Sequence, residues 1–459
     1  MRVTTVRSIG LSHLSYFVSS DGEAFVVDPR RDVDVYLQLS TETKSEIVHI
    51  FETHRNEDYV TGSLELQHYV PDAQISHSKE TDFKFGDNSL SDGETFNVGK
   101  TQVECVYTPG HSEDSMCYLT SDISVGPGPI VCFTGDTLFV NEIGRTDLVD
   151  IARHEEMTRK MFHSLHERVL TVGDGVIVHP GHGAGSVCGG DIGDREFSTI
   201  GYERINNPSL QMEEEDFVHA RLRQSLTLAR YFKHCEKLNT VGPPLLADIA
   251  AGRTLDPQSF EDLLKKPGHL VIDTRSPDFF VCGHIPKAVS LPLSRMGMLS
   301  GWVLNPDDSY LLVLERTEDL EQAMSYLFRI GFDNIVGYLG PGMEGWYEKG
   351  KPRSTLPNYT LEGVREQLEK GELTMVDVRQ LHEAEKEFVV GSAFAPLTNL
   401  TDNMSNLDKN KPTVMMCPHG TRATTAASLL RRAGFKQAGV ALEGIEGWKN
   451  RGYPVRSGK

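Results

Sequence analysis

The chain of 459 residues has no long apolar run, no closely spaced cysteine pair and a shortage of positive charge. No apolar stretch approaches the roughly 20 residues that a membrane-spanning helix needs, so we expect no membrane segment. The seven cysteines are odd in number and none forms a CxxC pair, which favours a reduced, cytoplasmic protein over a disulfide-stabilised one. The 46 Lys and Arg face 65 Asp and Glu, and the formal net charge of −19 argues against nucleic acid or an anionic membrane as partner.

Residues 1–200 alternate short apolar segments with turns rich in Gly, Asp and Ser. This alternation is typical of strands joined by tight connections. The predicted strands cover 15–20, 23–29, 46–53, 101–109, 129–136 and 175–180. Helical periodicity predicts helices over 151–170 and 213–237, and the paired prolines within 240–245 indicate a domain boundary.

The rest of the chain repeats itself. VIDTR at 271–275 recurs as MVDVR at 375–379, and MEGWYEKGKP at 343–352 recurs as IEGWKNRGYP at 445–454. Matches in the same order at near-constant spacing indicate two copies of one domain of about 100 residues. We place these copies at 246–352 and 356–459. Each reads as alternating strands and helices, which predicts a small α/β domain with a parallel sheet.

Four side chains of metal-ligand type follow the ends of predicted strands: His54, His111, Asp136 and His182. Loops that leave one edge of a sheet in a layered α/β fold converge on a crevice, where sites are built. One such residue alone is most often an ordinary polar loop residue. Four together predict a metal site.

The segment His54-Arg55-Asn56-Glu57-Asp58-Tyr59 resembles the HxHxDH motif of the metallo-β-lactamase superfamily. The resemblance implies an αββα sandwich over residues 1–241. Asn56 and Tyr59 stand where the superfamily has histidines, so a two-zinc site loses one ligand at each metal. His54, His111 and Asp136 remain, and two imidazoles with one carboxylate form the ligand set of non-heme iron chemistry. We therefore expect one Fe(II) per chain.

Within this superfamily the chain most resembles the persulfide dioxygenases, in which a G-R-T-D run follows the metal aspartate. That run contains Arg145, which the resemblance places in the substrate pocket. Asp58 and His182 serve the second metal in the superfamily. Here we expect them, with Tyr59, to surround the single metal centre as hydrogen-bonding or substrate-contacting groups. Cys188 lies in a glycine-rich loop near His182, where it either faces the pocket or is a plain buried thiol.

A second candidate site follows the strand at 413–416, where Cys417 begins the loop C-P-H-G-T-R and a helix begins near Thr421. Backbone N–H groups of such a loop point at the sulfur, which predicts a lowered thiol pKa and a stabilised persulfide. Arg422 supplies a fixed positive charge for an anionic substrate. The six residues from Cys417 to Arg422 resemble the active-site loop of the rhodaneses.

The first repeat has lost this loop. A constant offset of 102 residues places Glu315 opposite Cys417 and Leu320 opposite Arg422. A glutamate cannot carry sulfane sulfur. We therefore expect 246–352 to be a degenerate, non-catalytic rhodanese-like domain.

The whole chain resembles the persulfide dioxygenase–rhodanese fusion proteins of sulfide detoxification. The resemblance implies that iron and O2 convert a small-molecule thiol persulfide into sulfite and thiol. Cys417 would then transfer a sulfane sulfur to the sulfite and form thiosulfate. We also expect a homo-oligomer.

Two other functions stay open. One is a binuclear zinc thioester hydrolase like glyoxalase II, fused to a sulfurtransferase, although Asn56 and Tyr59 speak against it. The other is a sulfur carrier or interaction protein with a vestigial metal site, which requires the histidine and aspartate pattern to be coincidental.

Overall fold

The computed structural model describes residues 1–224, 227–249 and 252–457. It divides into two compact units, Met1–Asp248 with Phe328–Gly331, and Ile249–Leu327 with Phe332–Lys459. In the described part of the chain, no helix combines the length and the apolar character that crossing a membrane requires. The exact domain boundaries at 241, 246, 352 and 356 stay a prediction.

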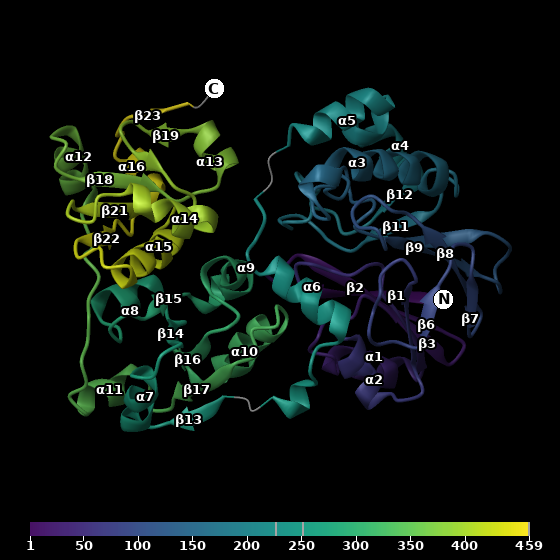
Figure 1. Ribbon diagram of the computed structural model, residues 1–459, viewed down its shortest axis with the longest axis horizontal. Coiled ribbons are helices and arrows are strands. Elements are labelled where there is room, and N and C mark those ends of the chain that lie inside the picture. Colours follow the sequence, from purple (N-terminus) through teal and green to yellow (C-terminus); the bar gives the residue numbers. More distant parts are fainter. Residues whose placement is uncertain (225–226, 250–251, 458–459) are drawn as a thin grey trace. The chain divides into compact units, whose positions relative to one another are not determined.

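The first unit contains two six-stranded sheets (Figure 1). The first sheet has the order β1 (Arg2–Ser8), β2 (His13–Ser20), β3 (Glu23–Val27), β4 (Glu46–Phe51), β5 (Gln74–Ser78), β6 (Asn88–Leu90). The second has the order β12 (Ser198–Thr199), β11 (Ile177–Pro180), β10 (Pro129–Gly135), β9 (Met116–Asp122), β8 (Thr101–Tyr107), β7 (Thr95–Val98). All six strands expected from the sequence are present, together with edge and hairpin strands that its pattern did not predict.

Side-chain alternation along β2 explains why the sheets stack as layers. Tyr16 and Val18 pack with Phe133 of the second sheet, whereas Phe17 points to the opposite face and packs with Tyr36 of a covering helix. Successive residues of a strand face opposite sides, so a strand that is apolar throughout is buried on both faces. Burying each such aromatic side chain contributes on the order of 1.5–3 kcal/mol.

Helices complete the outer layers of this unit. They are α1 (Asp34–Thr43), α2 (Ser63–Tyr69), α3 (His154–His163), α4 (Ile200–Asn206), α5 (Glu214–Leu222) and α6 (Phe232–Val241). Side chains of α1 and α2 join the core cluster of the first sheet, and those of α3 and α5 join that of the second. The unit is therefore the αββα sandwich that the sequence predicted.

The single helix expected over 213–237 is wrong. α5 ends at Leu222 and α6 begins at Phe232, and residues 225–226 of the expected helix lie outside the described residues. The backbone carbonyl of Thr227 instead accepts a hydrogen bond from the Arg145 side chain at 3.3 Å. In a continuous helix this carbonyl would accept from a backbone N–H of the same helix, and here it bonds to a distant side chain instead. The helix expected over 151–170 is present as α3, with short helical turns at Ile151–Arg153 and Ser164–Val169 on either side.

The second unit contains two parallel sheets, one for each repeat (Figure 1). The first has the order β13 (Arg253–Leu255), β17 (Ile335–Leu339), β16 (Ser309–Val313), β14 (His269–Asp273), β15 (Val289–Ser290). The second has the order β20 (Ala393–Phe394), β18 (Thr374–Asp377), β21 (Thr413–Met416), β22 (Ala438–Val440). A separate antiparallel pair joins β19 (Phe388–Val389) to β23 (Val455–Arg456).

Each repeat carries its own helices. Those of the first are α7 (Pro257–Leu264), α8 (Pro277–Cys282), α9 (Leu293–Val303), α10 (Leu320–Phe328) and α11 (Gly342–Glu348). Those of the second are α12 (Leu361–Glu369), α13 (Leu381–Lys386), α14 (Leu400–Asn403), α15 (Thr421–Arg432) and α16 (Gly444–Asn450). The α/β architecture predicted for both repeats is confirmed.

Strand register corrects the alignment of the two repeats. Asp273 pairs with Val313 in the first sheet, and the equivalent Asp377 pairs with Met416 in the second. The residue that follows β16 is Leu314, so Leu314 and not Glu315 corresponds to Cys417.

The same register continues through the following helix. Phe332 N–H donates to Leu327 O, and Phe435 N–H donates in the same way to Leu430 O. Arg422 therefore corresponds to Asp319 and not to Leu320. A single offset does not align the two repeats over their whole length, because some loops differ in length by one residue. Asp273 and Asp377 are 104 residues apart, whereas Val313 and Met416 are 103 apart. The first repeat lacks the cysteine and the arginine in either alignment.

Candidate metal centre and sulfur-transfer loop

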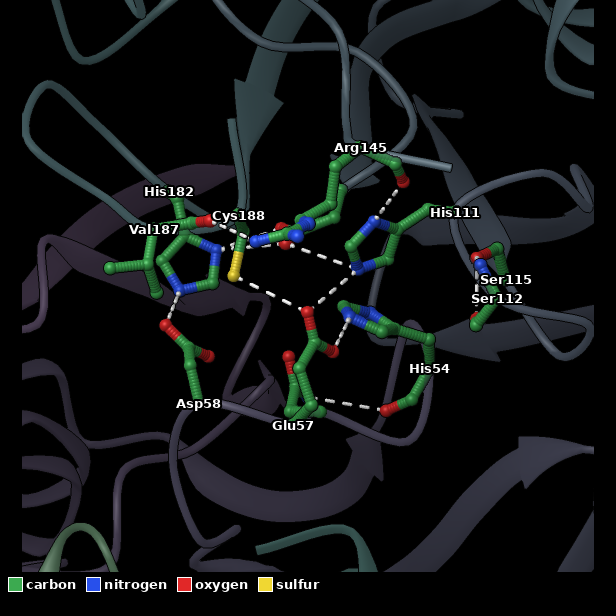
Figure 2. Close-up of polar contacts among 12 residues, drawn as sticks. His54, Glu57, Asp58, His111, Ser112, Ser115, Arg145, His182, Val187 and Cys188 are labelled. Atoms are coloured by element: carbon green, nitrogen blue, oxygen red, sulfur yellow. Dashed lines mark hydrogen bonds and ion pairs between the residues drawn. The ribbon is translucent and has the colours of Figure 1, made fainter. Parts of the chain in front are cut away.

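Three strand ends deliver His54, His111 and Asp136 to one point in the first unit. His54 follows β4, His111 follows β8 and Asp136 comes directly after β10. One ligand atom from each lies within 4.8 Å of the others, and all three residues are buried. Figure 2 shows the rings of His54 and His111 side by side.

The hydrogen bonds around the two rings fix which nitrogen faces the centre. Thr53 Oγ1 donates to Asp28 Oδ2 at 2.8 Å, so it accepts from His54 Nδ1 at 2.9 Å. His111 Nδ1 donates to the Arg145 carbonyl at 2.9 Å. Nε2 of each ring therefore faces the centre, and among the described residues neither Nε2 atom has a hydrogen-bond partner. Buried unpartnered imidazole nitrogens aimed at one point fit a metal ion.

Carboxylates make the centre strongly negative. Burial alone would lower the pKa of His111, but Glu57 and Asp136 outweigh it and raise that pKa to about 9. Burial also opposes ionisation of Asp136, yet the neighbouring rings, His182 foremost, hold its pKa well below the usual range. Such a field favours a cation at the centre.

Glu57 is a site residue that the sequence argument did not single out. Its Oε1 lies 3.3 Å from His111 Nε2, and its Oε2 lies 3.9 Å from His54 Nε2 (Figure 2). Burial opposes its ionisation, but His111 and His54 lower its pKa to about 2. Its position directly before Asp58, inside the segment His54–Tyr59, is the sequence feature that could have pointed to it.

The two residues that replace motif histidines turn elsewhere. Asn56 donates from Nδ2 to the His54 carbonyl at 3.2 Å. Tyr59 stacks on His13 with ring centroids 3.9 Å apart, and its buried hydroxyl has no hydrogen-bond partner within the described part of the chain.

Asp58, His182 and Cys188 form a second cluster beside the first. One ligand atom from each lies within 4.8 Å of the others. His182 Nε2 is 3.0 Å from Asp58 Oδ2 (Figure 2). His182 Nδ1 donates to Asp136 Oδ1 at 2.8 Å. Burial and the nearby carboxylates raise the pKa of the Cys188 thiol well above its ordinary value. Cys188 is therefore a neutral thiol next to the centre.

Arg145 is buried against the same centre. Its guanidinium pairs with Asp147 at 2.6 and 2.8 Å and donates to the Val187 carbonyl at 3.2 Å. Its own carbonyl orients His111. These contacts tie Arg145 to the loops around the centre, and its predicted contact with substrate stays a prediction.

The second candidate site lies in the second repeat of the second unit. Cys417 follows β21, is buried, and accepts a hydrogen bond from Ala423 N–H at 3.4 Å. Gly420 adopts a left-handed conformation with φ +79°, and a Cβ there would lie 2.7 Å from the Leu442 carbonyl oxygen. Only glycine fits this place, so Gly420 sets the turn that brings the loop over the sulfur.

The expected low pKa of Cys417 is not what the environment produces. Burial raises the thiol pKa above its ordinary value, although the backbone N–H groups of Ala423 and His419 and the charge of Arg422 oppose that rise. The physical reason is that the sulfur is withdrawn from water, a penalty that sequence spacing does not reveal.

Arg422 forms a two-pronged ion pair. Its Nη1 and Nη2 lie 2.6 and 2.7 Å from the two carboxylate oxygens of Glu383. Glu383 Oε2 also accepts from the Gln380 N–H at 3.0 Å, at the start of α13. Sequence reasoning missed Glu383, because nothing in the segment 380–386 links it to a loop about 40 residues later.

The corresponding place in the first repeat is a pocket of about 190 Å³. It is lined by Leu314–Thr317 and Tyr338–Gly342. The Glu315 carboxylate accepts a hydrogen bond from the Ser276 N–H at 3.3 Å.

Family comparisons agree with this architecture. Residues 9–182 match the sequence model of the metallo-beta-lactamase superfamily, and residues 256–349 and 360–451 match that of the rhodanese-like domain. The chain is therefore a metallo-β-lactamase superfamily domain followed by two rhodanese-like domains.

The chain is similar to several proteins whose names describe enzymes. A solved structure described as a metallo-beta-lactamase from Staphylococcus aureus is 27% identical, covers 74% of this chain and 98% of that chain, and gives a TM-score of 0.66. The Homo sapiens protein "Persulfide dioxygenase ETHE1, mitochondrial" is 28% identical over 201 residues, 43% of this chain and 70% of that protein. The "Hydroxyacylglutathione hydrolase, mitochondrial" of Saccharomyces cerevisiae is 32% identical over 185 residues, 37% of this chain and 60% of that protein. The chain is thus related both to a persulfide dioxygenase and to hydroxyacylglutathione hydrolases.

Proposed function

We propose that this protein is a non-heme iron persulfide dioxygenase coupled to a rhodanese sulfurtransferase, and that it converts a small-molecule persulfide to thiosulfate by way of sulfite. The observation that carries the proposal is the convergence of two unpartnered imidazole nitrogens, His54 Nε2 and His111 Nε2, on the Asp136 carboxylate. This ligand set is typical of Fe(II) sites that react with dioxygen. The same chain carries a sulfur-transfer loop at Cys417.

The proposed assignment to one ion rests on the altered motif. Asn56 and Tyr59 carry no imidazole, so neither supplies the ligand that a two-zinc hydrolase uses at its position. Asn56 instead hydrogen-bonds to backbone, and Tyr59 stacks on His13. His182 Nδ1 is engaged with Asp136 and supports that carboxylate from outside the centre.

In the proposed reaction the iron, when bound, supplies the activation of dioxygen. The persulfide RS–SH, O2 and water give the thiol RSH and sulfite, so the terminal sulfur is oxidised and the S–S bond breaks. The buried surroundings of His111 and Asp136 hold the ligands in place.

The second proposed reaction belongs to Cys417. Its thiolate attacks the sulfane sulfur of a second persulfide, the S–S bond of that persulfide breaks, and Cys417–S–SH forms while RS⁻ leaves and takes up a proton from water. Sulfite then attacks the outer sulfur, the S–S bond to Cys417 breaks, and thiosulfate leaves. Arg422 supplies positive charge for the anionic sulfite. Because both reactions use persulfide and share sulfite, one chain that carries both sites raises the effective concentration of sulfite at its acceptor.

The setting belongs to the same proposal. All seven cysteines are free thiols, in keeping with a reducing, cytoplasmic location and sulfide detoxification. A homo-oligomer is part of the proposal and is tested by the molar mass of the purified protein in solution.

Metal content and oxygen uptake test the proposal together. We expect one iron per chain and oxygen consumption with glutathione persulfide, with both lost together in His111→Ala. His166→Ala, a histidine on the helical turn Ser164–Val169, is the matched control and should keep both. Wild-type protein that binds iron but consumes no oxygen with any small persulfide would contradict the assignment.

A zinc hydrolase is the second candidate. The cluster of Asp58, His182 and Cys188 offers three potential ligands for another ion, and hydroxyacylglutathione hydrolases are among the relatives. Two zinc ions per chain with hydrolysis of a glutathione thioester would favour this function over the oxygenase.

A further inference from the structure

The side chain of Glu57 reaches the metal centre from the loop that carries His54. Glu57 is 2% exposed, and its Oε1 lies 3.3 Å from His111 Nε2 and 3.4 Å from Cys188 Sγ. Figure 2 shows its carboxylate between the two histidine rings and the Cys188 sulfur. We propose, on the basis of the metal centre above, that the Glu57 carboxylate is a fourth protein ligand of the ion.

Separations between candidate ligand atoms support this role. Two ligands at right angles, each about 2.1 Å from one ion, lie about 3 Å apart. His111 Nε2 is 3.5 Å from Asp136 Oδ2 and 3.3 Å from Glu57 Oε1. Glu57 therefore satisfies the distance requirement at least as well as the predicted ligand Asp136. Ligand atoms of Glu57, Asp136 and Cys188 also lie within 4.8 Å of one another.

The contact between His111 and Glu57 requires a proton or a metal ion between the two atoms. His111 Nδ1 donates to the Arg145 carbonyl, so Nε2 is the ring nitrogen that faces the Glu57 carboxylate. Two acceptors at 3.3 Å repel each other unless a proton or a metal ion lies between them. The thiol of Cys188 is a weak donor and does little to offset the cost of burying a carboxylate.

A proton shared with His111 is the competing explanation, and it predicts a different dependence on Glu57. A second carboxylate ligand would balance the charge of a divalent ion with Asp136 and two neutral imidazoles. It would also occupy one position that the histidine–aspartate set leaves open. Fewer coordination positions on the ion would then remain for substrate and dioxygen. The altered histidine motif alone does not predict this.

Metal binding measured without turnover tests this assignment. The experiment titrates Fe(II) and Co(II) into wild type, Glu57→Gln and Glu57→Asp against a competing chelator, and records the Co(II) absorption bands. We expect Glu57→Gln to weaken binding by about 10- to 100-fold and to change the Co(II) spectrum. Glu57→Asp should recover part of the affinity. Glu236→Gln, a half-buried acid on α6 that pairs with Arg55, is the matched control and should leave both readouts unchanged.

An affinity and spectrum that stay unchanged in Glu57→Gln would overturn the proposal and favour the shared proton. His54→Ala separates this failure from failure of the metal centre itself. If His54→Ala loses the ion and Glu57→Gln does not, only the fourth ligand is wrong. If neither variant loses it, the centre is wrong as well. Should Glu57→Gln fail to fold, a crystal structure of Co(II)-loaded wild type decides: a Glu57 oxygen about 2.1 Å from the ion supports the proposal, and one beyond about 3 Å overturns it.

Discussion

The two rhodanese-like repeats share a framework of side-chain contacts, and they differ at the loop that carries Cys417 in the second repeat. In each, an aspartate at the end of a buried strand pairs with an arginine two residues later: Asp273 with Arg275 at 2.6 Å, and Asp377 with Arg379 at 2.7 Å. In each, a buried tryptophan donates from its indole nitrogen to a proline carbonyl six residues on, at 2.8 and 3.1 Å. These contacts hold the scaffold and carry no information about which repeat is active.

The difference begins where Gly420 corresponds to Thr317. Gly420 is left-handed and lets the loop from Cys417 curl over its own sulfur before α15 begins. The first repeat instead passes through a short helical turn, Thr317–Asp319, in which Arg316 pairs with Asp319. A threonine disfavours the left-handed conformation, so the cradle does not form and a pocket takes its place. Loss of the nucleophile and loss of the loop shape therefore go together.

Removing the Cys417 sulfur should have the largest effect on sulfur transfer, the activity expected of the second repeat and not of the first. Cys417→Ser keeps the loop but carries no sulfane sulfur, so transfer of sulfur from persulfide to sulfite should fall by at least about 1,000-fold. Sulfite should accumulate in place of thiosulfate during persulfide turnover, with oxygen uptake retained. Product identity at early times is the measurement, because sulfite and persulfide also react slowly without the enzyme.

The matched control is Cys282→Ser, an exposed cysteine of the first repeat that should leave the products unchanged. Thiosulfate formation at the wild-type rate in Cys417→Ser would remove Cys417 as the acceptor and make Cys188 the next candidate. Loss of oxygen uptake in the same variant would show that the two sites are coupled.

Giving the active loop the residue of the inactive one should have the next largest effect. Gly420→Thr places a Cβ 2.7 Å from the Leu442 carbonyl oxygen and forces a left-handed threonine, a strain of about 1–3 kcal/mol. Sulfur transfer should fall about 10- to 100-fold because the loop moves away from Cys417. Thermal unfolding and sulfur-transfer kinetics are measured together.

The reciprocal change, Thr317→Gly, is the control for Gly420→Thr. It should leave sulfur transfer intact, since the first repeat has no cysteine in its loop. A fully active Gly420→Thr enzyme would show that loop shape and nucleophile are independent, contrary to the comparison.

Glu383→Gln should have a smaller effect, and one with a defined sign. Glu383 neutralises Arg422, so its removal leaves more positive charge beside Cys417 and for sulfite. The KM for sulfite should fall by about three- to tenfold, which corresponds to about 1 kcal/mol. Burial raises the Cys417 pKa and Arg422 opposes the rise, so the variant should lower that pKa. The rise of sulfur-transfer rate with pH should move to lower pH.

Glu387→Gln is the control for this charge effect. Glu387 lies on the same segment and pairs with Lys449 at 2.7 Å, so its loss should move neither KM nor the pH profile. An unchanged KM for sulfite in Glu383→Gln would mean that Arg422 does not bind the acceptor.

Sequence pattern was sufficient where function depends on the order of residues along strands. His54 follows β4 of the first sheet, His111 and Asp136 follow β8 and β10 of the second, and the loops after these strand ends meet at one point. Glu57 and Glu383 could not be ranked this way, because their partners are fixed by side-chain direction. Local periodicity could not predict the break between α5 and α6, because the contact from Arg145 to the Thr227 carbonyl joins residues 82 apart in the sequence.

The smallest expected effect concerns Glu315, which stands next to the place of the missing cysteine. Its carboxylate accepts a long hydrogen bond, 3.3 Å, from the Ser276 N–H, and it is an exposed residue of the pocket lining. Glu315→Gln keeps an acceptor for that contact, so sulfur transfer should stay within about twofold and the free energy of unfolding within about 0.5 kcal/mol of wild type. Thiosulfate formation and thermal unfolding check both values, with Cys417→Ser as the inactive reference. A large loss of sulfur transfer in folded Glu315→Gln would contradict the strand register that aligns Leu314 with Cys417, and would mean that the loop of the first repeat takes part in the chemistry.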